Sequence, residues 1–185
     1  MKKLVLTSLL AFMTVSGASA ATNYFVGGSA AMGFDSDHAD VISIAPEFGW
    51  KVDSNWDLGV AASFGYAHKY IDENLVEDDA HAYGVDVFAR YKVAQFGDVN
   101  LLLKGSVGAD FLRFDGDTEE ELGASIVPMI TYDLSESFTL YANLNFLGAY
   151  AGYNFDDKDW GFGALVNADN VLNTSDFQIG FTYNF

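Results

Sequence analysis

The sequence predicts an all-β chain that folds as an eight-stranded antiparallel up-and-down transmembrane β-barrel. Along eight segments, large apolar residues alternate with small or polar ones, the period of two expected of a strand with one apolar face. Short turns and longer acidic connections alternate between these segments, as they do in barrels that cross a membrane. Half of the residues are hydrophobic, 16% are aromatic and only two are Pro, a composition that suits many strands.

The first twenty residues are expected to be a signal peptide rather than part of the barrel. Lys2 and Lys3 precede an apolar run over 4–15, and small residues at 18–20 offer a cleavage site after Ala20. A membrane-spanning helix is the alternative, but the run is shorter than the roughly 20 apolar residues that a span requires. We therefore expect residues 1–20 to be cleaved and residues 21–185 to form the barrel domain.

Each expected strand carries large apolar side chains at every second position. In chain order the strands are expected at 24–34, 41–51, 56–68, 81–93, 99–113, 122–132, 138–150 and 177–185. The alternating apolar positions of these strands begin, in the same order, at Tyr24, Ile42, Trp56, Tyr83, Val99, Leu122, Phe138 and Phe177. Short turns are expected at 52–55, 95–98 and 133–137, and longer connections at 35–40, 69–80, 114–121 and 151–173.

The apolar faces are expected to meet lipid rather than a buried core. A lipocalin-like calyx and a β-sandwich are the soluble alternatives, and both would bury the large residues. Aromatic residues, however, stand near both ends of the apolar faces, as Trp56 and Tyr66 do on the third strand. Ten residues at about 3.3 Å each, tilted by about 40°, separate such a pair by roughly 25 Å, the height of the lipid-facing band between aromatic girdles.

Composition excludes several classes of function. Without its first twenty residues the chain has seven basic and 26 acidic residues, which leaves a formal net charge of −19. Such a charge excludes nucleic acid as a partner, since phosphates are bound by Lys and Arg. The absence of Cys excludes a disulfide scaffold and thiolate metal sites.

Charged residues on the inward faces are candidates for a lumenal network. The interior of an eight-stranded barrel is filled by side chains, and an unpaired charge there would cost several kcal/mol. We predict a network around Glu47, Arg90 and Lys104, with Asp86 slightly nearer the long connections. A polar plug is the favoured interpretation, and a proton or ion path is the alternative.

The long connections hold most of the negative charge and offer candidate cation ligands. Seventeen of the 26 acidic residues lie there, and carboxylate clusters can hold Ca²⁺ or Mg²⁺ weakly. The candidates are Asp35, Asp37, Asp40, Asp115 and Asp117, whose spacing does not match an EF-hand loop. Solvated negative loops are the favoured interpretation, and no cofactor is expected.

Signals for catalysis are weak. His38, His68 and His81 stand near the end of the barrel that carries the long connections, where a His-containing site could act on lipids. No Ser occupies a strained-turn motif and the glycines form no phosphate-binding pattern. The sequence therefore predicts a protein that is not an enzyme.

Four segments, 46–50, 55–59, 88–91 and 181–185, carry a resemblance to a known family. With them the chain resembles the small outer-membrane β-barrels of Gram-negative bacteria, of the OmpX, Ail and OmpA-barrel type, and the "porin family" barrels of Bacteroidetes. The resemblance implies an outer-membrane location with both termini in the periplasm, and contact with outer-membrane lipid and lipopolysaccharide. It also implies that the barrel assembly machinery reads the closing strand through Phe177, Ile179, Phe181, Tyr183 and Phe185.

Three functions are compatible with these features. The favoured one is a non-enzymatic surface protein that supports the cell envelope and presents acidic extracellular loops to divalent cations or an extracellular protein. A narrow, porin-like pore is the main alternative, and a lipid-modifying barrel enzyme is the third. A charged tail after Phe185, or the substitution Phe185→Asp, is expected to impair assembly.

Overall fold

The structure is a computed structural model that describes residues 23–34, 40–71, 76–114, 117–145, 147–166 and 177–185. The expected signal peptide lies outside these residues. The strands are β1 (Tyr24–Phe34), β2 (Asp40–Lys51), β3 (Trp56–Ile71), β4 (Val76–Phe96), β5 (Val99–Phe114), β6 (Asp117–Asp133), β7 (Phe138–Leu144), β8 (Leu147–Asn154), β9 (Asp159–Val166) and β10 (Phe177–Asn184). None of the described segments forms a helix that is long and apolar enough to cross a membrane.

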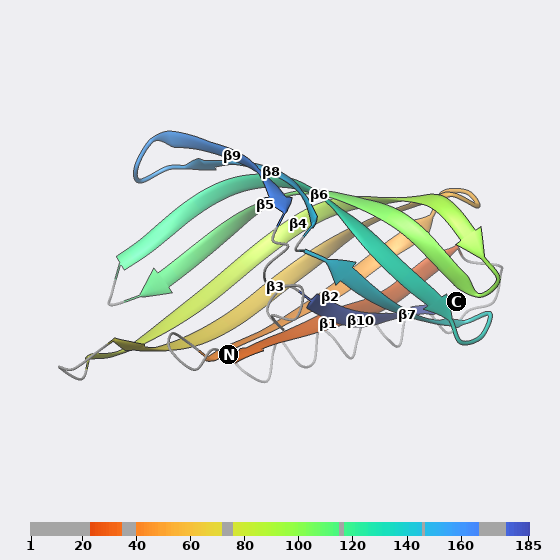
Figure 1. Ribbon diagram of the computed structural model, residues 1–185, viewed down its shortest axis with the longest axis horizontal. Coiled ribbons are helices and arrows are strands. Elements are labelled where there is room, and N and C mark those ends of the chain that lie inside the picture. The colour runs from red at the N-terminus through yellow and green to blue at the C-terminus, as the bar shows by residue number, and fades with distance from the viewer. Residues whose placement is uncertain (1–22, 35–39, 72–75, 115–116, 146, 167–176) are drawn as a thin grey trace.

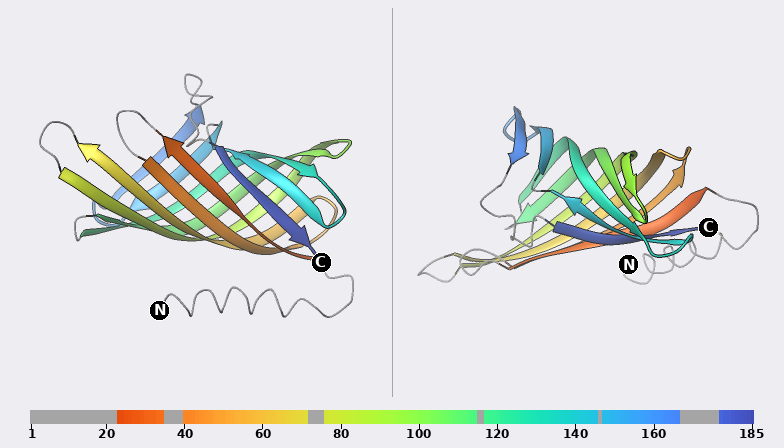
Figure 2. Two further views of the ribbon diagram at one scale, coloured as in Figure 1. Left: turned by 90° about the horizontal axis from the view of Figure 1, so that it is seen from below. Right: turned by 45° about the vertical axis from the view of Figure 1, so that its right-hand side comes forward.

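Eight of these strands close into a ring (Figure 1). Strands β1 to β6 pair in sequence order, β7 pairs with β6, and β10 lies between β7 and β1. Every pairing is antiparallel, and each strand of the ring bonds to a neighbour on both sides over at least part of its length. The structure confirms the predicted all-β, eight-stranded antiparallel barrel, whose tilted strands are seen from two sides in Figure 2.

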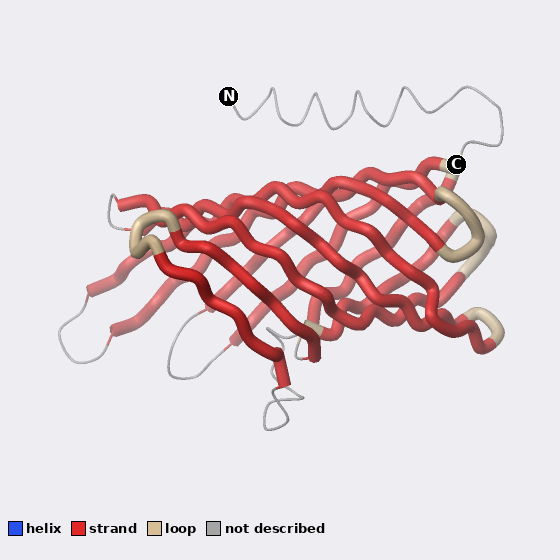
Figure 3. Tube along the Cα trace, turned by 90° about the horizontal axis from the view of Figure 1, so that it is seen from above, coloured by secondary structure: helices blue, strands red, loops and turns tan. Residues whose placement is uncertain are grey.

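The two ends of the barrel differ in their connections (Figure 3). Tight turns join β2 to β3, β4 to β5 and β6 to β7 at one end, which we call the turn end. Gly97 supplies the positive φ (64°) that the β4–β5 turn needs, and Asp53 accepts hydrogen bonds from the backbone N–H groups of Asn55 and Trp56. The opposite end, which we call the loop end, carries the β8–β9 turn.

The seventh strand of the ring is interrupted, contrary to the prediction of one strand over 138–150. β7 pairs with the turn-end half of β6, and β8 pairs with its loop-end half. The last β6–β7 pair is Met129 with Asn143, and the nearest β6–β8 pair is Ile126 with Ala149. These two pairs are three residues apart on β6 but six residues apart on the seventh strand, which therefore holds three extra residues. Because three extra residues are an odd number, the face that looks outward changes from even to odd positions.

Part of the predicted 151–173 connection is a β-hairpin. β8 continues to Asn154 and β9 follows from Asp159, paired to β8 along its whole length. The turn is held by the Asn154 side chain, which accepts hydrogen bonds from the N–H groups of Asp156 and Asp157, and Lys158 takes a positive φ of 56°. The rings of Tyr153 and Trp160 stand 5.1 Å apart across the hairpin, a contact that favours this pairing over a loop.

The predicted connections 69–80 and 114–121 are also shorter than expected. β3 and β4 remain paired up to Ile71 and Val76, and β5 and β6 up to Phe114 and Asp117. Backbone pairing therefore continues past the point where the apolar alternation ends. The ladder is made by main-chain groups, so polar side chains do not interrupt it.

The outer wall exposes large apolar side chains between two belts of aromatic residues. Val60, Val85, Val87, Val107 and Ile126 are exposed in the middle of the wall. Exposed aromatic residues nearer the turn end are Tyr24, Trp50, Trp56, Tyr91, Tyr132 and Tyr183, and those nearer the loop end are Phe64, Tyr66, Tyr83, Phe111 and Trp160. An apolar band of this extent has no stable contact with water, so it faces lipid, as the alternation predicted.

Candidate functional site

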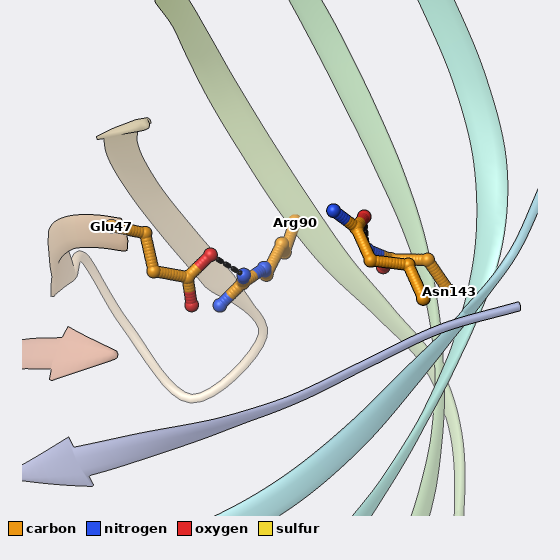
Figure 4. Close-up of polar contacts among 4 residues, drawn as sticks. Glu47, Arg90 and Asn143 are labelled. Carbon is orange, nitrogen blue, oxygen red and sulfur yellow. Dashed lines mark hydrogen bonds and ion pairs between the residues drawn. The ribbon is translucent and has the colours of Figure 1, made fainter. Parts of the chain in front are cut away.

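The lumen is closed by a buried ion pair from two strands. Glu47 of β2 and Arg90 of β4 both point inward, and Nη2 of Arg90 donates a hydrogen bond of 2.6 Å to Oε2 of Glu47 (Figure 4). Their side chains are 2% and 3% exposed. The two side chains are therefore almost wholly buried, and they fill the cross-section of the lumen at this height.

Three aromatic rings surround the guanidinium of Arg90. Its Cζ lies 4.5 Å from the ring centre of Phe88, 5.0 Å from that of Tyr141 and 5.4 Å from that of Phe25. Rings at these distances attract a cation through their negative faces, more strongly where water is excluded. We call Phe25, Glu47, Phe88, Arg90 and Tyr141 the lumenal plug.

Glycines on the neighbouring strands make room for these rings. A Cβ atom at Gly49 would collide with the ring of Phe25, and one at Gly59 would collide with the ring of Phe88. The rings can therefore lie flat against the inner wall, where a larger residue would push them into the lumen. Beside them pack Ala61, Leu102 and Met129, so the plug is apolar around its charged centre.

The other two predicted lumenal residues, Lys104 and Asp86, are not ion-paired to Glu47 or Arg90 among the described contacts. Lys104 is next to Arg90 in the β4–β5 register, but its Nζ lies 5.2 Å from the centre of the Phe88 ring. Asp86 faces inward opposite Gly108, nearer the loop end than Arg90. Of the predicted network the structure joins Glu47 to Arg90 and leaves Lys104 and Asp86 apart from that pair, and the roles of all four residues remain predictions.

A polar cavity of about 250 Å³ lies between the plug and the turn end. Its wall is held by hydrogen bonds around Asp133, which accepts from Nδ2 of Asn100 at 3.0 Å and from the Thr139 hydroxyl at 2.7 Å. Asn100 Nδ2 also donates to Oγ1 of Thr131 at 3.1 Å. Arg90 and Tyr141 line this cavity at its inner limit, so the cavity is blind at the plug.

The loop end of the lumen carries carboxylates. Asp86, Asp110 and Glu121 lie on the inner faces of β4, β5 and β6, with glycines beside them. Glu119 and Glu120 of β6, and Asp156, Asp157 and Asp159 of the β8–β9 hairpin, are exposed at the same end. Asp156 accepts a hydrogen bond of 3.2 Å from the N–H of Glu120, which ties the hairpin to β6.

The predicted cation ligands fall mostly outside the described residues. Asp35, Asp37 and Asp115 are not described. Asp40 and Asp117 are described only through their backbone, as the first residues of β2 and β6. Within the described ranges, no three His, Asp or Glu side chains are placed to hold a metal ion.

The histidines form no assembled constellation in the part of the chain that is described. His38 is outside it, and His68 is placed through the backbone of β3 alone. His81 is exposed on β4, where its ring stands 5.4 Å from that of Tyr66.

The closing strand occupies its predicted place beside β1. Ile179, Phe181, Tyr183 and Phe185 have exposed side chains on the outer wall, and Phe177 begins β10. The N–H of Phe185 donates to the carbonyl of Tyr24 at 3.1 Å, so both described ends meet at the turn end.

Sequence reasoning missed the aromatic half of the plug. Phe25, Phe88 and Tyr141 lie on inward faces by strand parity, but the predicted network includes only the charged residues of those faces. The detectable pattern is a large ring at an inward position that lies one strand away from an inward glycine. Phe25 with Gly49 and Phe88 with Gly59 both show it, since each pair is in register.

Fold and plug together define a small transmembrane β-barrel with a closed lumen. Similar solved structures include Neisserial surface protein A, at 14% sequence identity with a TM-score of 0.56, over 90% of this chain and 100% of that one. A major outer membrane protein from Thermus thermophilus matches at 11% identity and a TM-score of 0.51, again over 90% and 100%. No family model and no curated protein matches the sequence. At these identities the likeness shows the fold, which is that of small outer-membrane barrels.

Proposed function

We propose that this protein is a non-enzymatic component of the outer membrane of a Gram-negative bacterium. In this role it supports the envelope and presents an acidic surface outside the cell. The observation that carries the proposal is the combination of a lipid-facing apolar wall with a lumen closed at Glu47 and Arg90. A wall of this kind anchors the protein in a bilayer, and a closed lumen removes the passage that a porin needs.

The acidic surface is the part of the molecule offered to partners. The β8–β9 turn carries Asp156, Asp157 and Asp159 against one cation, Lys158. Excess negative charge attracts divalent cations, which link carboxylates to the phosphates of lipopolysaccharide, or the basic surface of an extracellular protein. The proposed orientation puts the turn end and both termini in the periplasm, and the hairpin outside.

The orientation can be tested by placing an epitope tag in the β8–β9 turn, next to Lys158, and labelling intact cells with an antibody. We expect labelling without permeabilisation. A matched tag in the β2–β3 turn, next to Ser54, is expected to require permeabilised cells. The reverse pattern would contradict the proposed orientation.

The proposed role can be tested by deleting the gene and restoring it in two forms. Deletion is expected to increase leakage of a periplasmic marker enzyme and sensitivity to detergents, and the unaltered gene is expected to reverse both. A version with Asp156→Asn, Asp157→Asn and Asp159→Asn is expected to restore integrity but to lose Ca²⁺-dependent binding at the cell surface. A deletion strain with an unaltered envelope would refute the envelope role.

A narrow pore is the second candidate, and the blind cavity at the turn end is the only described feature that favours it. Conduction would require Arg90 to leave both Glu47 and three ring contacts at once. The plug therefore favours the surface role over the pore.

A further inference from the structure

The polar cavity between the plug and the turn end is open to solvent. Its volume is about 250 Å³, just below the roughly 300–1,000 Å³ of pockets that hold drug-sized molecules. The lining residues at its mouth are exposed, and they are Lys51, Asp53, Ser54 and Asn55. The buried side chains of Arg90 and Tyr141 lie at its inner limit. A small solute can therefore enter the cavity from the turn end.

Charged and polar side chains lie on two opposite sides of this cavity. Lys51 of β2 and Lys92 of β4 lie on the side centred on β3. Asp133 of β6 and Asn184 of β10 lie on the side centred on β7. Because β3 and β7 are four strands apart in a ring of eight, these two sides face each other across the lumen.

Two charged groups on the β3 side are already engaged by the protein. Arg90 donates a hydrogen bond to Glu47 through Nη2. The carboxylate of Asp53 accepts hydrogen bonds from the backbone N–H groups of Asn55 and Trp56, within its own turn. Both groups therefore have partners before any ligand is considered.

Two ammonium groups on the same side have no such partner. Among the described contacts, the side chains of Lys51 and Lys92 take part in no ion pair and no hydrogen bond. The carboxylate of Asp57, on β3 between them, also lines the cavity and offsets one of the two charges. Apart from the engaged groups, one positive charge is left in excess on this side, and it suits the carboxylate of a ligand.

The β7 side offers hydrogen-bond acceptors, and its described lining residues include no Lys or Arg. Each carboxylate oxygen of Asp133 accepts one hydrogen bond, from Asn100 or Thr139, and keeps a second lone pair. The side-chain oxygens of Asn100 and Asn184 are buried without a hydrogen-bond partner among the described residues. Asn100 is only 5% exposed, and a buried acceptor needs a donor from water or from a ligand. An ammonium group, with three N–H donors, suits this side.

We propose that this cavity binds a small zwitterion, whose carboxylate lies beside Lys51 and Lys92 and whose ammonium lies beside Asp133. The two charged groups of the ligand must reach opposite sides of the lumen, so they stand farther apart than in a free amino acid. A dipeptide with free ends has this chemistry and is small enough for the cavity. The site does not depend on the proposed surface role and requires only a folded barrel with an open turn end.

The test is a titration of the folded barrel in lipid nanodiscs, followed by nuclear magnetic resonance. The probe is glycylglycine, and we expect saturable shifts of the backbone N–H signals of Asn100 and Asp133. Three matched compounds each change one feature: N-acetylglycylglycine lacks the ammonium, glycylglycinamide lacks the carboxylate, and glycine holds the two charges closer together. Each is expected to bind at least about tenfold more weakly, the loss that one hydrogen bond to a charged group accounts for.

Lys92→Met tests the carboxylate end of the site, because it removes an ammonium and keeps an unbranched side chain. It is expected to weaken the binding of glycylglycine by about tenfold and to leave the weak binding of glycylglycinamide unchanged, since that compound has no carboxylate. Lys104→Met is the matched control and is expected to bind as the parent does, because Lys104 faces inward but does not line the cavity. If Lys92→Met does not fold, Lys51→Met removes the other ammonium.

Four results would overturn the proposal. They are no saturable shift with glycylglycine, which would leave the cavity to water alone; equal binding of the acetylated or amidated compound; equal binding of glycine; and unchanged binding of glycylglycine to Lys92→Met. Failure of the surface role in a deletion strain would leave each of these results unchanged.

Discussion

Replacing Arg90 by Ala tests the plug most severely. The substitution removes the only described ion-pair partner of Glu47 and leaves its carboxylate in a site where the side chain is 2% exposed. It also removes the cation from between the rings of Phe25, Phe88 and Tyr141. What remains is a buried negative charge beside a void of several methylene groups.

The magnitude follows from the burial of the pair. Removing one partner of a buried ion pair costs roughly 3–5 kcal/mol, because the other charge is left without compensation. Each ring contact contributes about 0.5–2 kcal/mol, but these terms overlap with the ion pair and do not add fully. We expect Arg90→Ala to lower the free energy of unfolding by roughly 3–5 kcal/mol.

The assay is reversible urea unfolding of the barrel in lipid vesicles, with Arg90→Ala, Glu47→Gln and the double variant measured together. The double variant is expected to cost less than the sum of the single variants, since removing both charges leaves neither unpaired. Lys104→Met is the matched control: it removes an inward cation without a described ion pair and is expected to cost less than about 1.5 kcal/mol. A cost for Arg90→Ala no larger than that of Lys104→Met would refute the reasoning.

Two further predictions concern the wall. Gly59→Ala is expected to reduce the folded fraction, measured by the gel-mobility shift of folded barrels, because its Cβ would collide with the ring of Phe88. Gly105→Ala is the control and is expected to fold as the parent does, because its Cβ would lie 3.9 Å from the nearest heavy atom. Equal folded fractions of the two variants would contradict the close packing at Gly59. Val87→Arg is expected to lower the free energy of unfolding in vesicles by about 2–4 kcal/mol, because it places a cation on the lipid-facing wall near the bilayer midplane. Asp86→Asn, on the inner face, is the control and is expected to change that free energy by less than about 1 kcal/mol. If Asp86→Asn cost more than Val87→Arg, the inward and outward faces would be exchanged.

The alternation of side chains was sufficient to predict the ring and the direction of most side chains. Strand parity placed Glu47 and Arg90 inward and Val60 and Val107 outward, as the structure has them. Parity is reliable here because a slip of one residue would move a whole apolar face from lipid into the lumen.

The seventh strand shows where parity fails. An odd insertion between Asn143 and Ala149 exchanges the two faces, and a pattern that continues through it is read in the wrong phase. The β8–β9 hairpin was missed for the same reason. Its outward residues, Ala149, Ala151 and Tyr153, fall on odd positions, while the strand before the break uses even ones.

The limits of the long connections could not be predicted from the alternation of apolar and polar residues. That alternation depends on what the two faces of a strand contact, whereas the strand itself is held by backbone hydrogen bonds that any side chain allows. Lys69 and Asp78, for example, pair through the backbone in a stretch that has no apolar period. Strand parity also cannot predict which partner an inward charged residue contacts. Lys104 and Arg90 are neighbours in register, yet only Arg90 reaches Glu47, because the ring of Phe88 lies beside Lys104.

The central claim is that the barrel spans the bilayer with its lumen closed by Glu47, Arg90 and three aromatic rings. Single-channel recording of the parent protein in planar bilayers tests it most directly, after protease protection has shown that the barrel is inserted. A sealed lumen predicts a current that remains at the baseline of the protein-free membrane across the applied voltages. Reproducible stepwise currents of uniform size would contradict the plug.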